Sequence, residues 1–119
     1  MSFQIQITDK AQSDINAAAD YIEFSLRNPV ASDAMLDAVE QEVNSLAEFP
    51  ERYSLAADDV LSSWGIRFVR VRNYLAFYRV DTEAQVVTVV RFLYGKSNWA
   101  SILRCDLRSI KTDLPTSAL

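Results

Sequence analysis

Three apolar runs, rich in β-branched and aromatic residues, lie close together in the second half of the chain. They are Ile66–Val71, Tyr74–Val80 and Val86–Tyr94. Only Arg72-Asn73 separates the first two runs, and only Asp81–Gln85 separates the second from the third. Connections this short cannot cross over a sheet to bring strands parallel, so the three strands must form an antiparallel meander.

The first half of the chain predicts a short strand followed by two helices. Phe3–Ile7 alternates apolar and polar residues, which is typical of a strand. Thr8 stands in the N-cap position of an amphipathic helix of about 18 residues, whose apolar residues recur at helical spacing. Asn28-Pro29 ends this helix and begins a second one, which Phe49-Pro50 stops. Because the connection is so short, the two helices are expected to form an antiparallel hairpin.

The remaining segments complete an α+β pattern. Residues 51–63 are mixed in character and are interpreted as a loop with one helical turn at most. Asn98–Ile110 is expected to form a final helix, in which Cys105 has no chemical role, and residues 112–119 a flexible tail. The order is therefore β-α-α-β-β-β-α, in a single domain of residues 1–119. In this fold the helical hairpin packs on one face of a small antiparallel sheet.

The last strand is apolar on both of its faces. Strict alternation places Val86, Thr88, Val90, Phe92 and Tyr94 on one face and Val87, Val89, Arg91 and Leu93 on the other. The helical hairpin can cover only one of these faces. The second face needs the C-terminal helix, another chain, or both, and an uncovered apolar patch there would itself indicate a binding site.

Charge is distributed unevenly along the chain. The 119 residues have a net charge of −4. Residues 1–59 carry 3 basic and 12 acidic residues, a balance of −9, whereas residues 60–111 carry 9 basic and 3 acidic ones, a balance of +6. An asymmetry of this kind indicates that the basic part contacts nucleic acid or an acidic protein. We therefore expect the working surface within residues 64–104.

Missing residue types exclude several kinds of chemistry. The sequence has no histidine, which excludes Ser-His-Asp, Cys-His and histidine-ligated metal mechanisms. Its only glycines, Gly65 and Gly95, cannot form a phosphate-binding loop, and a single cysteine forms neither an internal disulfide nor a structural metal site by itself. We expect no metal and no cofactor. Since the sequence has neither a membrane-spanning run nor a signal-peptide pattern, a cytoplasmic location is expected.

Cationic side chains on the predicted sheet are candidate partner-binding residues. Those on the first two strands are either solvated charges that prevent sheet-edge pairing or a surface that binds carboxylates or phosphates. Trp64 and Trp99 flank the meander, and packing explains both, although Trp99 is the better candidate for an interface anchor. The candidate partner-binding residues are Arg67, Arg70, Arg79, Arg91, Lys96 and Trp99.

Several motifs occur in a fixed order along the chain. The second half contains Gly-Ile-Arg, then Asn-Tyr-Leu-x-Phe-Tyr-Arg-Val-Asp, then Val-x-x-Val-Arg-x-Leu-Tyr-Gly. The first half contains Ala-x-x-Asp-Ile, Asp-Tyr-Ile, an Asn-Pro helix entry and a Leu-x-x-Phe-Pro helix exit. Over residues 3–103 the chain resembles the RelE/ParE superfamily of type II toxin–antitoxin toxins, in particular the ParE-like plasmid stabilisation proteins.

The resemblance implies a growth inhibitor that a cognate antitoxin neutralises, either in a toxin–antitoxin hetero-oligomer or as a dimer. The superfamily contains ribosome-dependent mRNA endoribonucleases and ParE-like poisons of DNA gyrase. The nuclease branch places an arginine where this chain has Tyr74, a basic cluster where it has only Lys96, and often a tyrosine or histidine beyond Tyr94, where it has neither. We therefore predict a gyrase poison. The alternatives are an endoribonuclease that acts on mRNA at the ribosome, and an inactive antitoxin-binding module.

RNA cleavage without histidine would have to use tyrosine, lysine, arginine or a carboxylate as acid, base and charge stabiliser. Arg91, Tyr94 and Lys96, at the end of the last strand, are the candidates for such a reduced catalytic site. Arg91 and Tyr94 are an odd number of residues apart, so they point to opposite faces unless the strand bulges or ends first. The competing interpretation is that Tyr94 packs under the helical hairpin and Arg91 makes a structural ion pair.

Overall fold

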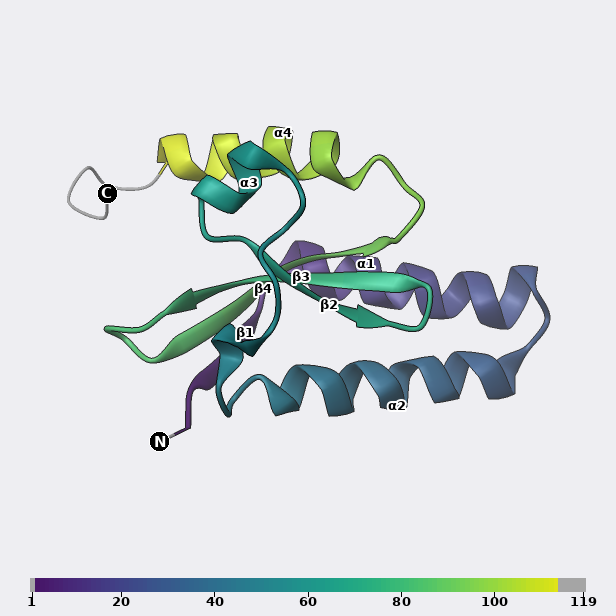
Figure 1. The fold of residues 1–119 in the computed structure, drawn as a ribbon. Helices are drawn as coiled ribbons and strands as arrows, with labels where there is room; N and C mark the ends of the chain where they lie inside the picture. Colours follow the sequence, from purple (N-terminus) through teal and green to yellow (C-terminus); the bar gives the residue numbers. More distant parts are fainter. Residues whose placement is uncertain (1, 114–119) are drawn as a thin grey trace.

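The helices and strands follow the order predicted from the sequence and confirm the α+β fold (Figure 1). The computed structural model describes residues 2–113, with side chains for residues 2–107. A π-helical turn (Tyr21–Ser25) follows the first helix, and a 3-10 turn (Pro50–Arg52) follows the second. The elements are β1 (Gln4–Ile7), α1 (Asp9–Asp20), α2 (Pro29–Ser45), α3 (Asp59–Ser63), β2 (Arg67–Val71), β3 (Tyr74–Asp81), β4 (Val86–Tyr94) and α4 (Trp99–Asp113).

The four strands form one mixed sheet in the order β1-β4-β3-β2. β2, β3 and β4 pair antiparallel, which confirms the meander. β1 runs parallel to β4, with Gln4 opposite Val86 and Ile7 opposite Val89. The alternation of β1 indicates a strand but does not specify its neighbour. Its parallel pairing is possible because the helical hairpin carries the chain across the sheet before the meander begins.

Side-chain caps begin both helices of the hairpin where the sequence predicts them. The Thr8 hydroxyl oxygen accepts a hydrogen bond of 3.1 Å from the N–H of Ala11, and the Asn28 side-chain oxygen accepts one of 3.0 Å from the N–H of Ala31. Each bond satisfies a backbone donor that has no partner inside its helix, and such a cap is worth about 1 kcal/mol.

The two helices of the hairpin end differently from the prediction. The last turn of the expected 18-residue helix is π-helical, since the N–H of Leu26 donates to the carbonyl of Tyr21 at 3.1 Å. α2 ends at Ser45 rather than at Phe49. There the N–H of Leu46 donates to the carbonyl of Val43 at 3.0 Å, which tightens the turn and stops the α-helix.

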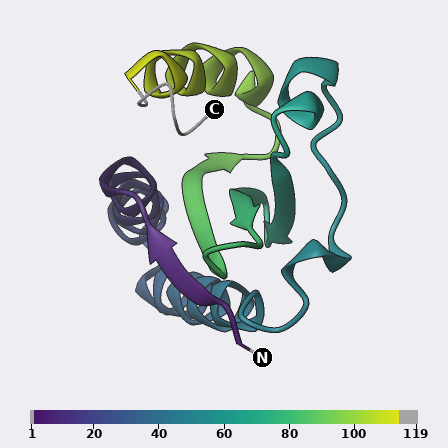
Figure 2. The same cartoon turned by 90° about the vertical axis from the view of Figure 1, so that its left-hand side faces the viewer.

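Apolar side chains form two clusters, one on each face of the sheet. Figure 2 shows α4 and α3 on the opposite side of the sheet from α2. On the hairpin side the buried cluster includes Ala11, Ile15, Met35, Val39, Tyr78 and Phe92. On the other side it includes Leu61, Ile66, Phe77, Val90 and Leu103. Burying a side chain of the larger kinds is worth roughly 1.5–3 kcal/mol, so both faces stabilise the fold.

A β-bulge in β4 overturns the predicted assignment of its two faces. Phe77 of β3 pairs with Arg91, whereas the next residue, Tyr78, pairs with Val89, so Val90 is the extra residue of the bulge. An extra residue inverts the alternation from that point onward. The hairpin-side cluster therefore contains Val87, Val89 and Phe92, and the cluster on the other face contains Val90.

The C-terminal helix covers the second face of the sheet. Leu103 and Leu107 of α4 are 0% and 7% exposed and belong to the same cluster as Phe77 and Val90. The sequence left open whether the C-terminal helix, another chain or both cover this face, and the structure shows that the C-terminal helix does. Its own apolar stripe meets that of the sheet.

α4 is also longer than predicted. It continues past Ile110 to Asp113, so the first two residues of the predicted 112–119 tail are helical. Residues 114–119 lie outside the described part of the chain. Within residues 2–113, no helix is both long and apolar enough to cross a membrane.

Tyr78→Phe is expected to lower the free energy of unfolding by about 1–3 kcal/mol, because it leaves the carbonyl of Pro50 without its buried donor. The Tyr78 hydroxyl, fully buried, donates to that carbonyl at 2.6 Å. Burial, only partly offset by the nearby Arg67 and Arg52, raises the pKa of Tyr78 to about 12. Between pH 10 and this pKa only the unfolded tyrosine ionises, so stability falls as pH rises. Urea unfolding at pH 8 to 11 measures both effects. If the stability of Tyr78→Phe fell equally steeply as the pH rises, the loss would not come from ionisation of Tyr78.

Candidate partner-binding surface

The end of β4 meets the turn between β2 and β3. Arg72 in this turn has a left-handed backbone with φ of 58°, and the following Asn73 accepts a hydrogen bond of 2.8 Å from the N–H of Gly95. A Cβ atom at Gly95 would lie 3.1 Å from that carbonyl oxygen, which is tighter than an ordinary contact. Glycine therefore allows the close approach, and Lys96, the next residue, is brought to the same end of the sheet.

Three cationic side chains gather at this end. The Nη1 atom of Arg70 donates to the carbonyl oxygen of Arg72 at 3.4 Å, and it lies 3.6 Å from where a Cβ of Gly95 would stand. Arg70, Arg72 and Lys96 are all exposed. None of the ion pairs among the side chains of residues 2–107 includes one of these three cations. Their charges therefore face solvent.

Two tyrosines, Tyr74 and Tyr94, lie at the same end of the sheet. They pair with each other on the hairpin-side face, whereas Arg70 pairs with Leu75 on the other face. The rings of Tyr74 and Tyr94 meet edge to face at 5.7 Å, and Tyr74 also stacks on Phe92 at 5.0 Å. Burial raises the pKa of Tyr74, and the neighbouring Tyr21 and Tyr94 raise it further by a smaller amount. Tyr94 is 44% exposed, so it lies at the edge of the hairpin-side cluster and not beneath the hairpin.

We call Arg70, Arg72, Tyr74, Tyr94 and Lys96 the cationic end. Its guanidinium groups offer pairs of parallel donors that match carboxylate and phosphate oxygens. Its tyrosines offer ring surface for packing or stacking on the hairpin-side face of the same end. The arrangement suits a partner that is anionic and carries apolar or aromatic groups.

Arg91 lies away from the cationic end, in an internal ion-pair network. Its Nε and Nη2 atoms donate to the two carboxylate oxygens of Asp14 at 2.6 and 2.9 Å, and its Nη1 atom donates to Asp106. The backbone N–H of Phe92 also donates to Asp14 at 3.1 Å. This network joins α1, β4 and α4 where solvent reaches only 14–17% of each of the three side chains. The interpretation of Arg91 as a structural ion-pair residue is confirmed.

The structure does not bring the three candidate catalytic residues together. Arg91 pairs with Phe77 and Tyr94 with Tyr74 along a regular stretch of the β3–β4 ladder, so the two side chains point to opposite faces. Lys96 comes after the end of β4 and is not part of this ladder. The bulge that could have united Arg91 with Tyr94 lies before Arg91, at Val90, and therefore leaves their relation unchanged.

The charges of the network stabilise one another. Hydrogen bonding to Asp14 outweighs the effect of burial and raises the pKa of Arg91. Burial by itself would raise the pKa of Asp106, but the hydrogen bonds from Lys10, at 3.0 Å, and from Arg91 lower it below 3.8. Both groups are therefore charged at neutral pH, and the network holds α4 against the rest of the fold.

Asp106→Asn is expected to destabilise the protein by about 1 kcal/mol at pH 7, since two charge-assisted hydrogen bonds weaken at a partly solvated site. The lowered pKa of Asp106 gives stability that is present above the pKa of the unfolded side chain and is lost as the pH falls through the folded value. The variant should therefore show a smaller decrease in melting temperature between pH 5 and pH 2.5. Thermal unfolding followed by circular dichroism measures this. An equal decrease in the melting temperature of the variant and of the unmodified protein over this pH range would argue against the network.

The other predicted partner-binding residues lie in different surroundings. Arg67 donates to the carbonyl oxygens of Tyr53 and Glu51 at 2.6 and 3.2 Å, so it fastens the loop before β2. Trp99 is partly buried and packs on Phe77 with ring centroids 5.2 Å apart. Arg79 is exposed, but it pairs with Thr88, towards the other end of β3. Of the predicted set, only Arg70 and Lys96 belong to the cationic end.

Sequence reasoning missed the partners of Arg91. Asp14 and Asp106 belong to helices separated by most of the chain, so no local pattern links them to Arg91. One local signal existed, because Asp14 follows the buried Ala11 by three residues and precedes the buried Ala18 by four, a spacing that places it beside the apolar stripe of α1. Among residues 2–107, no group of three carboxylates or cysteines is arranged to hold a metal ion.

The fold is shared with chains of two solved toxin–antitoxin structures. One is the chromosomal ParDE toxin–antitoxin system from P. aeruginosa, with a TM-score of 0.64, 18% identity, and coverage of 78% of this chain and 96% of that one. The other is the toxin–antitoxin complex RelBE2 from Mycobacterium tuberculosis, with a TM-score of 0.54, 21% identity, and coverage of 79% and 92%. At these identities the likeness shows the fold.

The helical hairpin, the meander and the parallel β1 thus form the fold that these two chains share. The family model "ParE toxin of type II toxin-antitoxin system, parDE" matches residues 5–99. Since this match spans most of the chain, the protein belongs to the ParE toxin family. No curated protein sequence matches it. The family match ends at Trp99, the first residue of α4.

Proposed function

We propose that this ParE-family toxin inhibits growth by binding and poisoning DNA gyrase and that a cognate antitoxin neutralises it. The position of Arg91 carries the proposal. Of the three candidate catalytic residues, only Arg91 can offer a phosphorane two parallel donors, yet both Asp14 and Asp106 occupy its guanidinium. A toxin whose best phosphate-stabilising cation is used inside the fold is better suited to binding than to cleavage.

The cationic end is the proposed surface for macromolecular contact. Arg70, Arg72, Lys96 and Tyr94 are all exposed at this end of the sheet. An antitoxin segment that carries carboxylates could occupy this surface and prevent the toxin from binding its target. The resemblance to chains of ParDE and RelBE2 complexes supports an antitoxin partner for this chain, in a toxin–antitoxin hetero-oligomer.

A supercoiling assay tests the proposed target directly. Purified toxin is titrated into gyrase, relaxed plasmid and ATP, and we expect supercoiling to fall and cleaved DNA to accumulate. Adding the cognate antitoxin in equimolar amount should restore supercoiling. Undiminished supercoiling at a large molar excess of folded toxin would exclude gyrase as the target.

The grouping of Tyr94 with three exposed cations favours one second candidate, a ribosome-dependent mRNA endoribonuclease. Arginines and a lysine can hold the phosphates of an RNA strand, and a tyrosine can take part in proton transfer. In a translating extract, cleavage that disappears in Tyr94→Phe combined with Lys96→Ala would support this function. Intact messenger RNA at toxin concentrations that stop growth would exclude it.

Induction without antitoxin separates these functions in cells. A gyrase poison should induce the DNA-damage response, whereas a ribosome-dependent nuclease should stop protein synthesis first. Normal growth despite accumulation of folded protein would instead support the inactive antitoxin-binding module. The measurement is a damage reporter and amino-acid incorporation followed over the same period.

A further inference from the structure

Phe49 is an exposed aromatic residue in an unfavourable backbone conformation. It directly precedes the Pro50–Arg52 turn and adopts φ 50° and ψ 59°, in the left-handed region. Its side chain is 79% exposed, the largest exposed fraction among the large apolar residues of the described chain. A bulky side chain with positive φ is a genuine outlier, and such strain persists only where the surroundings impose it.

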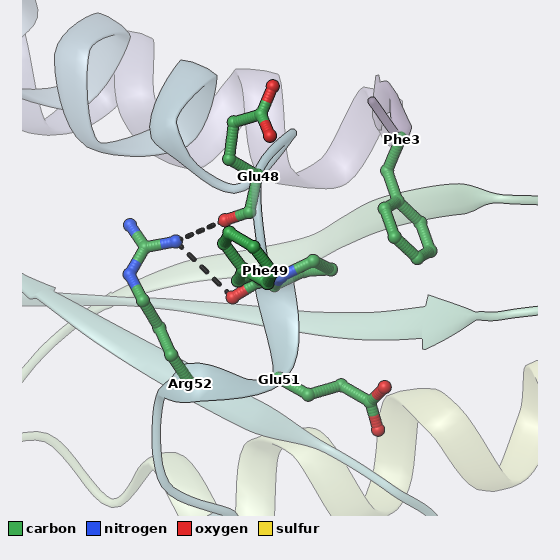
Figure 3. Close-up of a pocket in the computed structure, with 6 residues that line it drawn as sticks. Phe3, Glu48, Phe49, Glu51 and Arg52 are labelled. Atoms are coloured by element: carbon green, nitrogen blue, oxygen red, sulfur yellow. Dashed lines mark hydrogen bonds between the residues drawn. The ribbon is translucent and has the colours of Figure 1, made fainter. Parts of the chain in front are cut away.

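Hydrogen bonds from two elements hold the strained segment in place. The Nη1 atom of Arg52 donates to the carbonyl oxygens of Glu48 and Phe49 (Figure 3). The same atom donates to the carbonyl oxygen of Ser45, and the Nη2 atom donates to the Ser45 hydroxyl at 2.8 Å. On the other side of Phe49, the buried Tyr78 donates to the carbonyl of Pro50 at 2.6 Å. The backbone is therefore fixed at both ends, while the ring of Phe49 stays outside the core.

The ring of Phe49 borders an open cavity of about 560 Å³. Phe3, Phe49 and Pro50 provide its apolar walls, Glu48 and Glu51 provide carboxylates, and Arg52 provides one guanidinium. Figure 3 shows the Phe49 ring between the side chains of Glu48 and Glu51, with the Phe3 ring across the space. We call this the Phe3–Phe49 cavity.

The lining of the cavity carries two carboxylates and one guanidinium, a net charge of −1. Glu48 accepts a hydrogen bond of 3.0 Å from Ser2, a neutral donor, and Glu51 is 58% exposed with its nearest cation, Arg67, at 3.7 Å. The guanidinium groups of Arg52 and Arg67 both donate to backbone carbonyls of this region, so these two side chains chiefly stabilise the local backbone. An incoming ligand thus meets two carboxylates around two aromatic rings.

We propose that the Phe3–Phe49 cavity binds a basic peptide segment in which an arginine stands next to an aliphatic residue. The guanidinium would stack on the ring of Phe49 and pair with the carboxylates of Glu48 and Glu51, and the aliphatic side chain would enter between the two rings. Charge complementarity selects this occupant, because an acidic segment would meet like charges here. The cavity lies on the acidic half of the chain and is distinct from the cationic end, so the proposal is independent of the proposed function.

Synthetic hexapeptides that alternate leucine with arginine, with glutamine or with glutamate test the proposal on the full-length protein. We expect the arginine peptide to bind at least ten times more tightly than the glutamate peptide, with nuclear magnetic resonance shifts centred on Phe3 and Phe49. The affinity should fall as salt rises. Equal binding of all three peptides, or no binding of the arginine peptide at millimolar concentration, would overturn the proposal.

Phe49→Gly separates a binding role from a structural one. Glycine adopts positive φ without strain, so the variant should melt at the same temperature or a few degrees higher, while its affinity for the arginine peptide falls about tenfold. Glu48→Gln with Glu51→Gln should weaken binding similarly and leave the fold intact. Phe24→Ala is the matched control, because Phe24 is 68% exposed in the π-helical turn, at the opposite end of α2. Unchanged affinity in Phe49→Gly, or an equal loss in Phe24→Ala, would contradict the proposal.

Discussion

Arg91→Ala is expected to lower the free energy of unfolding by about 3 kcal/mol, at the lower end of the cost of breaking a buried ion pair. The variant leaves the carboxylates of Asp14 and Asp106 facing each other without the cation between them. The lower end applies because solvent still reaches 14–17% of these side chains. α4 should be affected most, since Asp106 is its contact with the network. Urea unfolding together with amide hydrogen exchange of α4 measures both effects.

Two controls distinguish this loss from the removal of any arginine. Arg91→Met keeps much of the packing volume but not the charge, so it should be nearly as destabilising as alanine. Arg104→Ala breaks a pair with Asp58 at 3.4 Å in which the arginine is 39% exposed, and it should cost less than about 1 kcal/mol. Equal losses in the free energy of unfolding for Arg91→Ala and Arg104→Ala would show that the network stabilises the fold no more than a partly exposed ion pair does.

Reversing the charge of the cationic end is expected to abolish toxicity without unfolding the protein. In the triple variant Arg70→Glu, Arg72→Glu and Lys96→Glu, all three side chains are exposed, so the core is untouched. Each reversal should cost on the order of 1 kcal/mol against an anionic partner, and together they correspond to about a hundredfold weaker antitoxin binding. Calorimetric titration with the cognate antitoxin at two salt concentrations measures the affinity, and growth after induction measures the toxicity.

Arg79→Glu is the matched control for the triple variant. Arg79 is an exposed arginine of the same sheet, and it lies towards the opposite end of β3 from Tyr74. Its reversal should leave toxicity and antitoxin affinity nearly unchanged. If it is as damaging as the triple variant, the binding surface extends along the sheet and the cationic end is not its centre.

Features determined by neighbouring residues could be predicted from the sequence. Thr8 and Asn28 cap helices with their own side chains, and the turn at Arg72 follows from a two-residue gap between strands. Such signals are local, so the order of the elements and the meander followed from the pattern. The Phe49-Pro50 pair predicted that the second helix stops before the sheet, but not its actual end at Ser45. It also did not predict the left-handed backbone of Phe49, because that depends on Arg52 and Tyr78.

Features that depend on distant contacts could not be predicted. The bulge at Val90 is set by the pairing of β4 with β3, and the partners of Arg91 are 77 and 15 residues away along the sequence. The cationic end illustrates the same limit. Arg70 and Lys96 were each identified as cations, but their grouping follows from the contact between Gly95 and Asn73.

The boundary of the family match has a consequence for the size of the folding unit. The match stops at Trp99, yet the side chains that seal Phe77 and Val90 from water, Leu103 and Leu107, come after it. A fragment that ends at Trp99 would expose the hydrophobic surface of the sheet to water. It would also leave Arg91 with only one of its two carboxylate partners, Asp14. The segment that identifies this toxin is therefore shorter than the segment it needs to fold.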